Sequence, residues 1–241
     1  MEHIVVQRAA FLPGSSGLLI QSYRLAVVTS EGDQSLSKPA EEFRPSTSRI
    51  EAFSDGVFAI VLTLLVLDLR VPKLADGYTE RDLFNALVDL GPRLVGFFVS
   101  FLVIAIFWVN HHQLFHSLAR ASRALLWHNN HLLFWMCVIP FPTAFLGEYH
   151  DRVVPVMLYG FVLFMGGVAF NLVLRHAVRA GLFDPTHSSE SLRKAVRRGV
   201  IGPIVYAAAV LLALVSVYIP LVLFIVVPLL YFIPQKIVRG E

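Results

Sequence analysis

Charged residues are scarce in this sequence. Only 15% of its 241 residues are charged, while 56% are apolar. An ordinary soluble domain is about 25% charged and about 45 to 50% apolar. So few charged side chains cannot cover the surface of a soluble domain of this length, which excludes that class and indicates that the protein lies in a lipid bilayer.

Several kinds of chemistry are also missing. The one cysteine, Cys137, lies within an apolar run, which excludes a disulfide inside the chain and a thiolate metal cluster. The sequence has no nucleophile elbow, no phosphate-binding glycine loop and no paired-carboxylate hydrolase site, so we expect no enzyme activity. The net charge is +3, but long stretches lack Lys and Arg, so we expect no nucleic-acid partner.

Apolar runs long enough to form membrane helices fill most of the chain. A bilayer-crossing helix needs about 20 mostly apolar residues. Six segments qualify: Ile50–Val71, Leu90–Gln113, Leu125–Gly147, Val153–His176, Gly199–Tyr218 and Pro220–Ile237. The last two share one apolar stretch, in which Pro220 indicates a break near residues 218–220. We predict an all-α membrane protein with six spans; five spans is the alternative.

The Lys and Arg residues predict the orientation. With six spans, 15 of the 20 fall on the side of the two termini and five on the other. Loops that remain in the cytoplasm accumulate Lys and Arg, so both termini are predicted to be cytoplasmic. The segment 1–45, rich in Ser, Glu, Lys and Pro towards its end, is predicted to be a flexible cytoplasmic tail, with an amphipathic surface helix as the alternative. Residues 46–241 form the predicted membrane domain.

Polar residues gather inside three predicted spans. Helix 1 carries Arg49, Ser54 and Asp55; helix 2 carries Trp108, Asn110, His111 and His112; helix 3 begins with His128, Asn129, Asn130 and His131. The three groups fall at a similar depth on the cytoplasmic side, so we expect them to meet. A buried Asp55 would be satisfied by an imidazole or an amide of a neighbouring helix. The group forms either a proton relay or ion site, or a polar clamp that fixes helix packing.

The histidines suggest a further possibility. His112 and His116 lie four residues apart on one helix face, and His128 and His131 follow a short loop. Four imidazoles can hold a metal or a haem. No carboxylate or thiolate lies in those stretches to complete such a site, and we therefore predict no metal and no cofactor.

Helix 1 also has an apolar stripe. Phe53, Ile60, Leu64 and Leu67 follow helical spacing, with Gly56, Ala59 and Thr63 beside them. Small residues let helices approach closely in lipid, so spacing alone indicates a packing face.

Three motifs resemble those of the transmembrane protein 175 family, the endosomal and lysosomal potassium channels and their prokaryotic relatives. They are the Arg-x-x-x-Phe-Ser-Asp core in RIEAFSDGVFAIVLTLLVL (49–67), FWVNHHQLF (107–115), and the Asn129 region with PFPT (140–143). The resemblance covers helices 1 to 3. It implies a six-helix protomer and a homotetramer around a central pore lined by helix 1.

The resemblance also implies residue roles. Ile60, Leu64 and Leu67 match apolar rings that constrict the pore, and Thr63 matches a hydroxyl-bearing position beside the first ring. The polar network between the helices comprises Arg49, Ser54, Asp55, Trp108, His111 and His112, and the Asn129 region of helix 3 is expected to join it. The chain lacks the TVGYG filter of ordinary potassium channels. The sequence thus predicts a potassium-preferring cation channel of the plasma membrane; the alternative is a proton-coupled transporter that uses Asp55 and His111.

Overall fold

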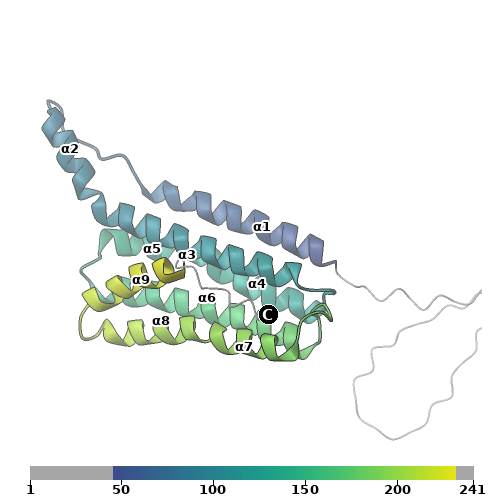
Figure 1. Cartoon of the computed structure of the whole chain (residues 1–241). Coiled ribbons are helices and arrows are strands. Elements are labelled where there is room, and N and C mark those ends of the chain that lie inside the picture. The colour runs from purple at the N-terminus through teal and green to yellow at the C-terminus, as the bar shows by residue number, and fades with distance from the viewer. Residues whose placement is uncertain (1–45, 232–241) are drawn as a thin grey trace, which may run out of the picture. The chain divides into compact units, whose positions relative to one another are not determined.

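The computed structural model describes residues 46–231, which are almost entirely helical (Figure 1). The predicted tail, 1–45, and the end of the sixth predicted span, 232–237, lie outside these residues. The described elements are α1 (Thr47–Leu64), the 3-10 helix η1 (Leu65–Asp68), α2 (Glu80–Asp89), α3 (Gly91–His116), α4 (Arg123–Val138), α5 (Pro140–Glu148), α6 (Val153–Arg179), α7 (Ser189–Gly199), α8 (Ile201–Leu212) and α9 (Tyr218–Tyr231).

Five helical stretches among the described residues are long and apolar enough to cross a membrane. They are Thr47–Asp68, Gly91–His116, Arg123–Glu148, Val153–Arg179 and Ser189–Leu212. The first four agree with the predicted spans to within a few residues. The described part of α9 is apolar but has 14 residues, about 21 Å of helix, which is shorter than the hydrocarbon core of about 30 Å.

Two predictions about connections were wrong. The break between the last two spans lies at 213–217, and Pro220 is in the first turn of α9, where a missing N–H costs no helix hydrogen bond. The connection between the fourth and fifth predicted spans, residues 177–198, is helical at both ends. It contains the end of α6 and most of α7, whose N-terminus is capped by the Ser188 hydroxyl.

The predicted outer loop also contains a helix, α2. Its N-terminus is a capping box, in which Thr79 accepts from the backbone N–H of Asp82 and Asp82 accepts from that of Thr79. The Asp82 carboxylate also accepts from the Thr79 hydroxyl at 2.7 Å. These hydrogen bonds to Thr79 lower the pKa of Asp82.

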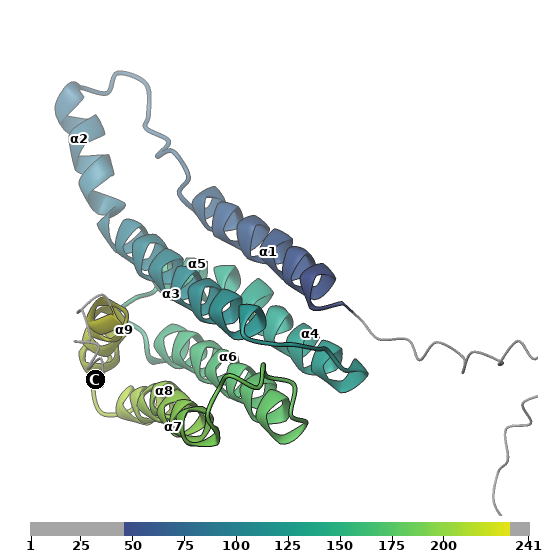
Figure 2. The ribbon, with the colours of Figure 1, turned by 45° about the vertical axis from the view of Figure 1, so that its right-hand side comes forward.

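The packing leaves α1 at one side of the bundle. Helix α6 packs against α4, α5 and α8, while α3 packs against α1, α5 and α9. Helix α1 contacts α3 and α4, and both ribbon views show α3 between α1 and α9 (Figures 1 and 2). One long face of α1 therefore has no helix beside it among the described residues.

The end of α6 depends on a glycine. Gly181 has a φ of +60°, and the Leu182 N–H donates to Ala177 O at 3.0 Å, which closes the last turn. Gly181→Ala is expected to lower the free energy of unfolding by about 1 kcal/mol, because a Cβ disfavours left-handed backbone. Thermal unfolding of the detergent-solubilised protein measures it. Gly202→Ala is the control. Gly202 lies in the first turn of α8, where an added Cβ would meet no atom within 4 Å, so this substitution should be neutral or stabilising. Equal shifts in both variants would contradict the prediction.

Candidate functional site

Helix α1 has two distinct faces. The buried face consists of Ile50, Ser54, Phe58 and Val61, and Leu65 of η1 continues it. These positions recur every three or four residues, so they lie on one side of the helix, toward α3 and α4. Because the protomer covers only this side, α1 presents its opposite side outward.

The predicted pore residues occupy that outward side. Ile60, Thr63, Leu64 and Leu67 are all exposed, as are Phe53 and Gly56 on the same stripe. The Thr63 hydroxyl donates to Ile60 O at 2.8 Å. Its proton is therefore used within the helix, and the Oγ1 lone pairs remain available as acceptors on the exposed side.

A chain of buried polar groups ties α1 to α3 and α4. Asn129 Nδ2 donates to Ser54 Oγ at 2.9 Å, and Asn129 Oδ1 lies 2.8 Å from His111 Nε2. The Ser54 hydroxyl donates in turn to Ile50 O at 2.8 Å. All three side chains are buried. The structure thus brings together one polar residue from each of the three helices.

His111 is held by packing as well as by its hydrogen bond. Its ring stacks on Phe115, with ring centroids 4.3 Å apart, and it also contacts Phe58 of α1. Nδ1 of His111 is buried and has no hydrogen-bond partner among the described residues. Among the side-chain polar atoms of Ser54, Asn129 and His111, this nitrogen is the one without a hydrogen-bond partner in the described part of the chain.

A second polar group lies beside the first, nearer the protein surface. Trp108 Nε1 donates to Asp55 Oδ1 at 2.9 Å, so the partner of Asp55 is an indole and not the expected imidazole or amide. His112 Nδ1 lies 2.8 Å from Glu51 Oε1. Arg49 is exposed in the first turn of α1, and no described residue joins its side chain to this group.

Glu51 is the residue that sequence reasoning missed. It precedes Asp55 by four positions, so both carboxylates lie on one side of α1, toward α3. This spacing was a usable signal. An acidic residue near the end of a span also resembles an ordinary interfacial charge, so the spacing alone does not identify the cluster.

The remaining histidines do not assemble. The His128 ring packs on His176, His131 Nε2 accepts from Trp135 Nε1 at 2.9 Å, and His116 stacks beside His112. Among residues 46–231, the group of possible metal ligands that does assemble is Glu51, Asp55 and His112. The four-histidine site considered from the sequence is therefore not formed.

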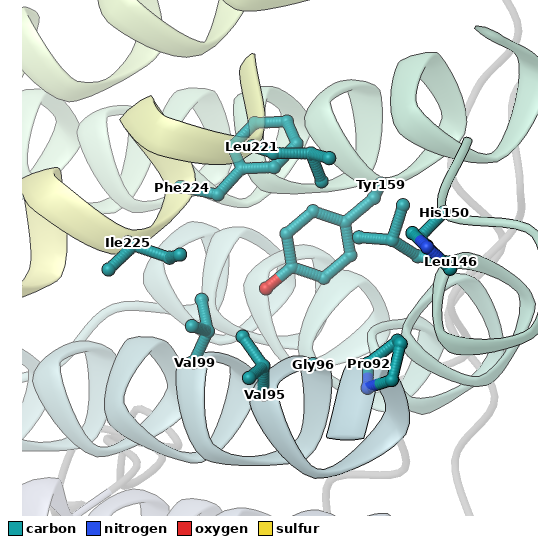
Figure 3. Close-up of a pocket in the computed structure, with 10 residues that line it drawn as sticks. All are labelled: Pro92, Val95, Gly96, Val99, Leu146, His150, Tyr159, Leu221, Phe224 and Ile225. Carbon is teal, nitrogen blue, oxygen red and sulfur yellow. The ribbon is translucent and has the colours of Figure 1, made fainter. Parts of the chain in front are cut away.

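An apolar cavity of about 300 Å³ lies elsewhere in the bundle (Figure 3). Its lining comes from α3, α5, α6, α9 and the turn after α5, and includes Val95, Leu146, Tyr159 and Phe224. No residue of α1 lines it. Enzyme and cofactor pockets usually add several convergent polar groups to such a lining, and this cavity has almost none.

The chain is similar to known channel proteins over most of its described length. The model of the family "Endosomal/lysosomal potassium channel TMEM175" matches residues 49–140, from α1 to the start of α5. A potassium channel of Streptomyces collinus is 44% identical over 175 residues, which make up 70% of this chain and 84% of that protein. The chain belongs to the TMEM175 family. The resemblance recognised in helices 1 to 3 is thereby confirmed.

Relatives in this family include solved and curated proteins. The crystal structure of a lysosomal potassium-selective channel TMEM175 homolog from Chamaesiphon minutus matches with a TM-score of 0.68 and 33% identity, covering 77% of this chain and 95% of that chain. The human endosomal/lysosomal proton channel TMEM175 is 33% identical over 138 residues, 54% of this chain and 27% of that protein. TMEM175 proteins form a channel family, which agrees with the expectation that this chain is not an enzyme. The five apolar stretches and the family together make it a multi-pass membrane protein.

Proposed function

We propose that this TMEM175 protein is a potassium-preferring cation channel whose pore is lined by the exposed side of α1. The observation that carries the proposal is the placement of Ile60, Thr63, Leu64 and Leu67 on the one side of α1 that the protomer leaves uncovered. The relatives named as potassium channels in Streptomyces and Chamaesiphon support the same ion.

Four copies of the chain, each with α1 innermost, would bring these side chains to a common axis. The rings of Ile60, Leu64 and Leu67 would then form apolar constrictions, which exclude water when narrow and conduct when slightly wider. The buried side of α1, tied through Ser54 to Asn129, holds the orientation that such rings require.

We assign the preference for potassium over sodium to Thr63 and the ring of Ile60 side chains. No TVGYG segment is present to supply a ring of carbonyl oxygens. An ion that loses part of its hydration shell at Ile60 needs a replacement oxygen, and Thr63 Oγ1 offers acceptor lone pairs because its proton is donated to Ile60 O. Potassium sheds water more easily than sodium, which sets the direction of preference. The permeant potassium ion requires no bound cofactor.

The proposal includes a topology and a location. We place α9 as the sixth crossing, which puts both termini in the cytoplasm, in agreement with the excess of Lys and Arg on that side. The homotetramer would lie in the plasma membrane, with lipid around α6 to α9.

The direct test is an ion-flux assay on the purified full chain in liposomes. An outward potassium gradient is expected to drive a faster flux than an equal sodium gradient, at neutral pH on both sides. Empty liposomes are the control. Equal rates for the two ions would overturn the potassium preference, and absence of flux from confirmed tetramers in both gradients would count against a constitutively open channel.

The alternative function, a proton-coupled transporter, rests on the buried and unpartnered Nδ1 of His111. Against a simple relay, Asp55 bonds to Trp108 while His111 bonds to Asn129, so the two groups have separate partners. A transporter would show saturable flux driven by a pH gradient and abolished in Asp55→Asn. Undiminished flux in an assembled Asp55→Asn variant rejects it.

A further inference from the structure

Glu51, Asp55 and His112 form a group that the proposed pore does not use. Their donor atoms, two carboxylate oxygens and one imidazole nitrogen, all lie within 4.8 Å of one another. The two carboxylates come from successive turns of α1, and the imidazole comes from α3. The group therefore bridges the helices at the N-terminal end of α1.

The two carboxylates give this group a negative charge that favours binding of a cation. No Lys or Arg among residues 46–231 lies within ion-pair distance of either carboxylate, and the ion pair that the group does contain joins His112 to Glu51. Two carboxylates held together without a Lys or Arg partner attract a positive ion.

The donor set and its spacing favour a particular class of ion. One nitrogen and two oxygens are a common ligand set for a divalent transition metal, whereas Mg²⁺ and Ca²⁺ take oxygen ligands alone. Bond lengths of about 2.0 to 2.2 Å place the donors of a tetrahedral zinc site about 3.4 Å apart. His112 Nδ1 and Glu51 Oε1 are already 2.8 Å apart, so small side-chain rotations suffice.

The surroundings of the group support binding as well. Asp55 Oδ1 accepts from Trp108 Nε1, which fixes the carboxylate and leaves its second oxygen for a metal. The His112 side chain is 51% exposed and that of Glu51 is 21% exposed, so an ion can reach them in the protomer. The fourth position of a tetrahedral ion would remain open to water.

We propose that Glu51, Asp55 and His112 bind one divalent transition-metal ion that links α1 to α3. The expectation from sequence was that no metal site exists, because no carboxylate lies near the histidines along the chain. The structure supplies the carboxylates from another helix.

Zinc binding to the purified, untagged full chain in detergent tests the proposal. Titration calorimetry is expected to find one Zn²⁺ per chain, with at least tenfold weaker binding in Glu51→Gln and in His112→Gln. His116→Gln, one turn farther along α3, is the matched control and should bind normally. Equal weakening in His116→Gln, or normal binding in both site variants, would overturn the proposal.

Three further measurements exclude trivial outcomes. His112→Cys replaces the imidazole with a thiolate, another strong zinc ligand, so it should restore binding that His112→Gln loses; failure to do so rejects His112 as a ligand. Ni²⁺ should quench the fluorescence of Trp108, and the quenching should disappear in Trp108→Phe. Displacement of Zn²⁺ by an equal concentration of Mg²⁺ would show that the group only attracts charge, and the site would be rejected. None of these measurements depends on ion flux.

Discussion

Ile60→Asn is expected to raise cation flux through liposomes at least about tenfold and to reduce the preference for potassium over sodium. A tenfold change corresponds to a barrier lower by about 1.4 kcal/mol. Four apolar side chains at one ring exclude water, and four amides would let a hydrated ion pass. Because Ile60 lies on the uncovered side of α1, the substitution should leave the fold of the protomer intact.

The matched control for this experiment is Ile204→Asn. Ile204 on α8 is 61% exposed and Ile60 is 60% exposed, so the two substitutions place the same side chain on similarly exposed helix surfaces. Only Ile60 lies on the proposed pore face. Tetramer content, measured by cross-linking, has to be equal in all samples. Unchanged flux in Ile60→Asn, or the same change in both variants, would contradict the assignment of the constriction.

Asn129→Leu is expected to destabilise the protein by about 1 to 3 kcal/mol. The leucine has a similar size but removes the hydrogen bond to Ser54 and the one to His111, and each interhelical bond contributes about 0.6 to 2 kcal/mol in membranes. The buried imidazole of His111 would then have no hydrogen-bond partner among the described residues. A fall of about 2 to 10 °C in Tm in detergent is the expected readout.

Asn130 provides the control for this substitution. It follows Asn129 on α4 but is exposed, so Asn130→Leu removes no buried hydrogen bond. We expect its Tm to stay close to that of the unchanged chain. If Asn129→Leu is no less stable than Asn130→Leu, the buried polar chain contributes nothing to the packing of α1.

The first four spans were predictable because length and hydropathy alone decide them. The same holds for the meeting of Ser54, Asn129 and His111, since helices of known direction place residues at a known depth. The partner of Asp55 was not predictable in this way. Depth places several donors nearby, and the rotation of α3 decides that the indole of Trp108 is the one within reach.

Other features were missed although signals for them existed. Thr79 and Asp82 have the spacing of a capping box, and Ser188 precedes an amphipathic basic segment, but both were overlooked inside predicted loops. The cluster of Glu51 with His112 is different, because its members are 61 positions apart in the chain. Only the crossing of α1 and α3 brings them together.

The buried and exposed sides of α1 can be substituted with different effects on the protein. The side chains that secure α1 to its neighbours, such as Ser54 and Phe58, are separate from those on its free side, such as Ile60 and Leu67. Substitutions on the free side thus change little of the energy that folds a protomer. A library of variants restricted to that side would explore permeation properties with few losses to misfolding, which makes α1 a favourable place to engineer new ion preferences.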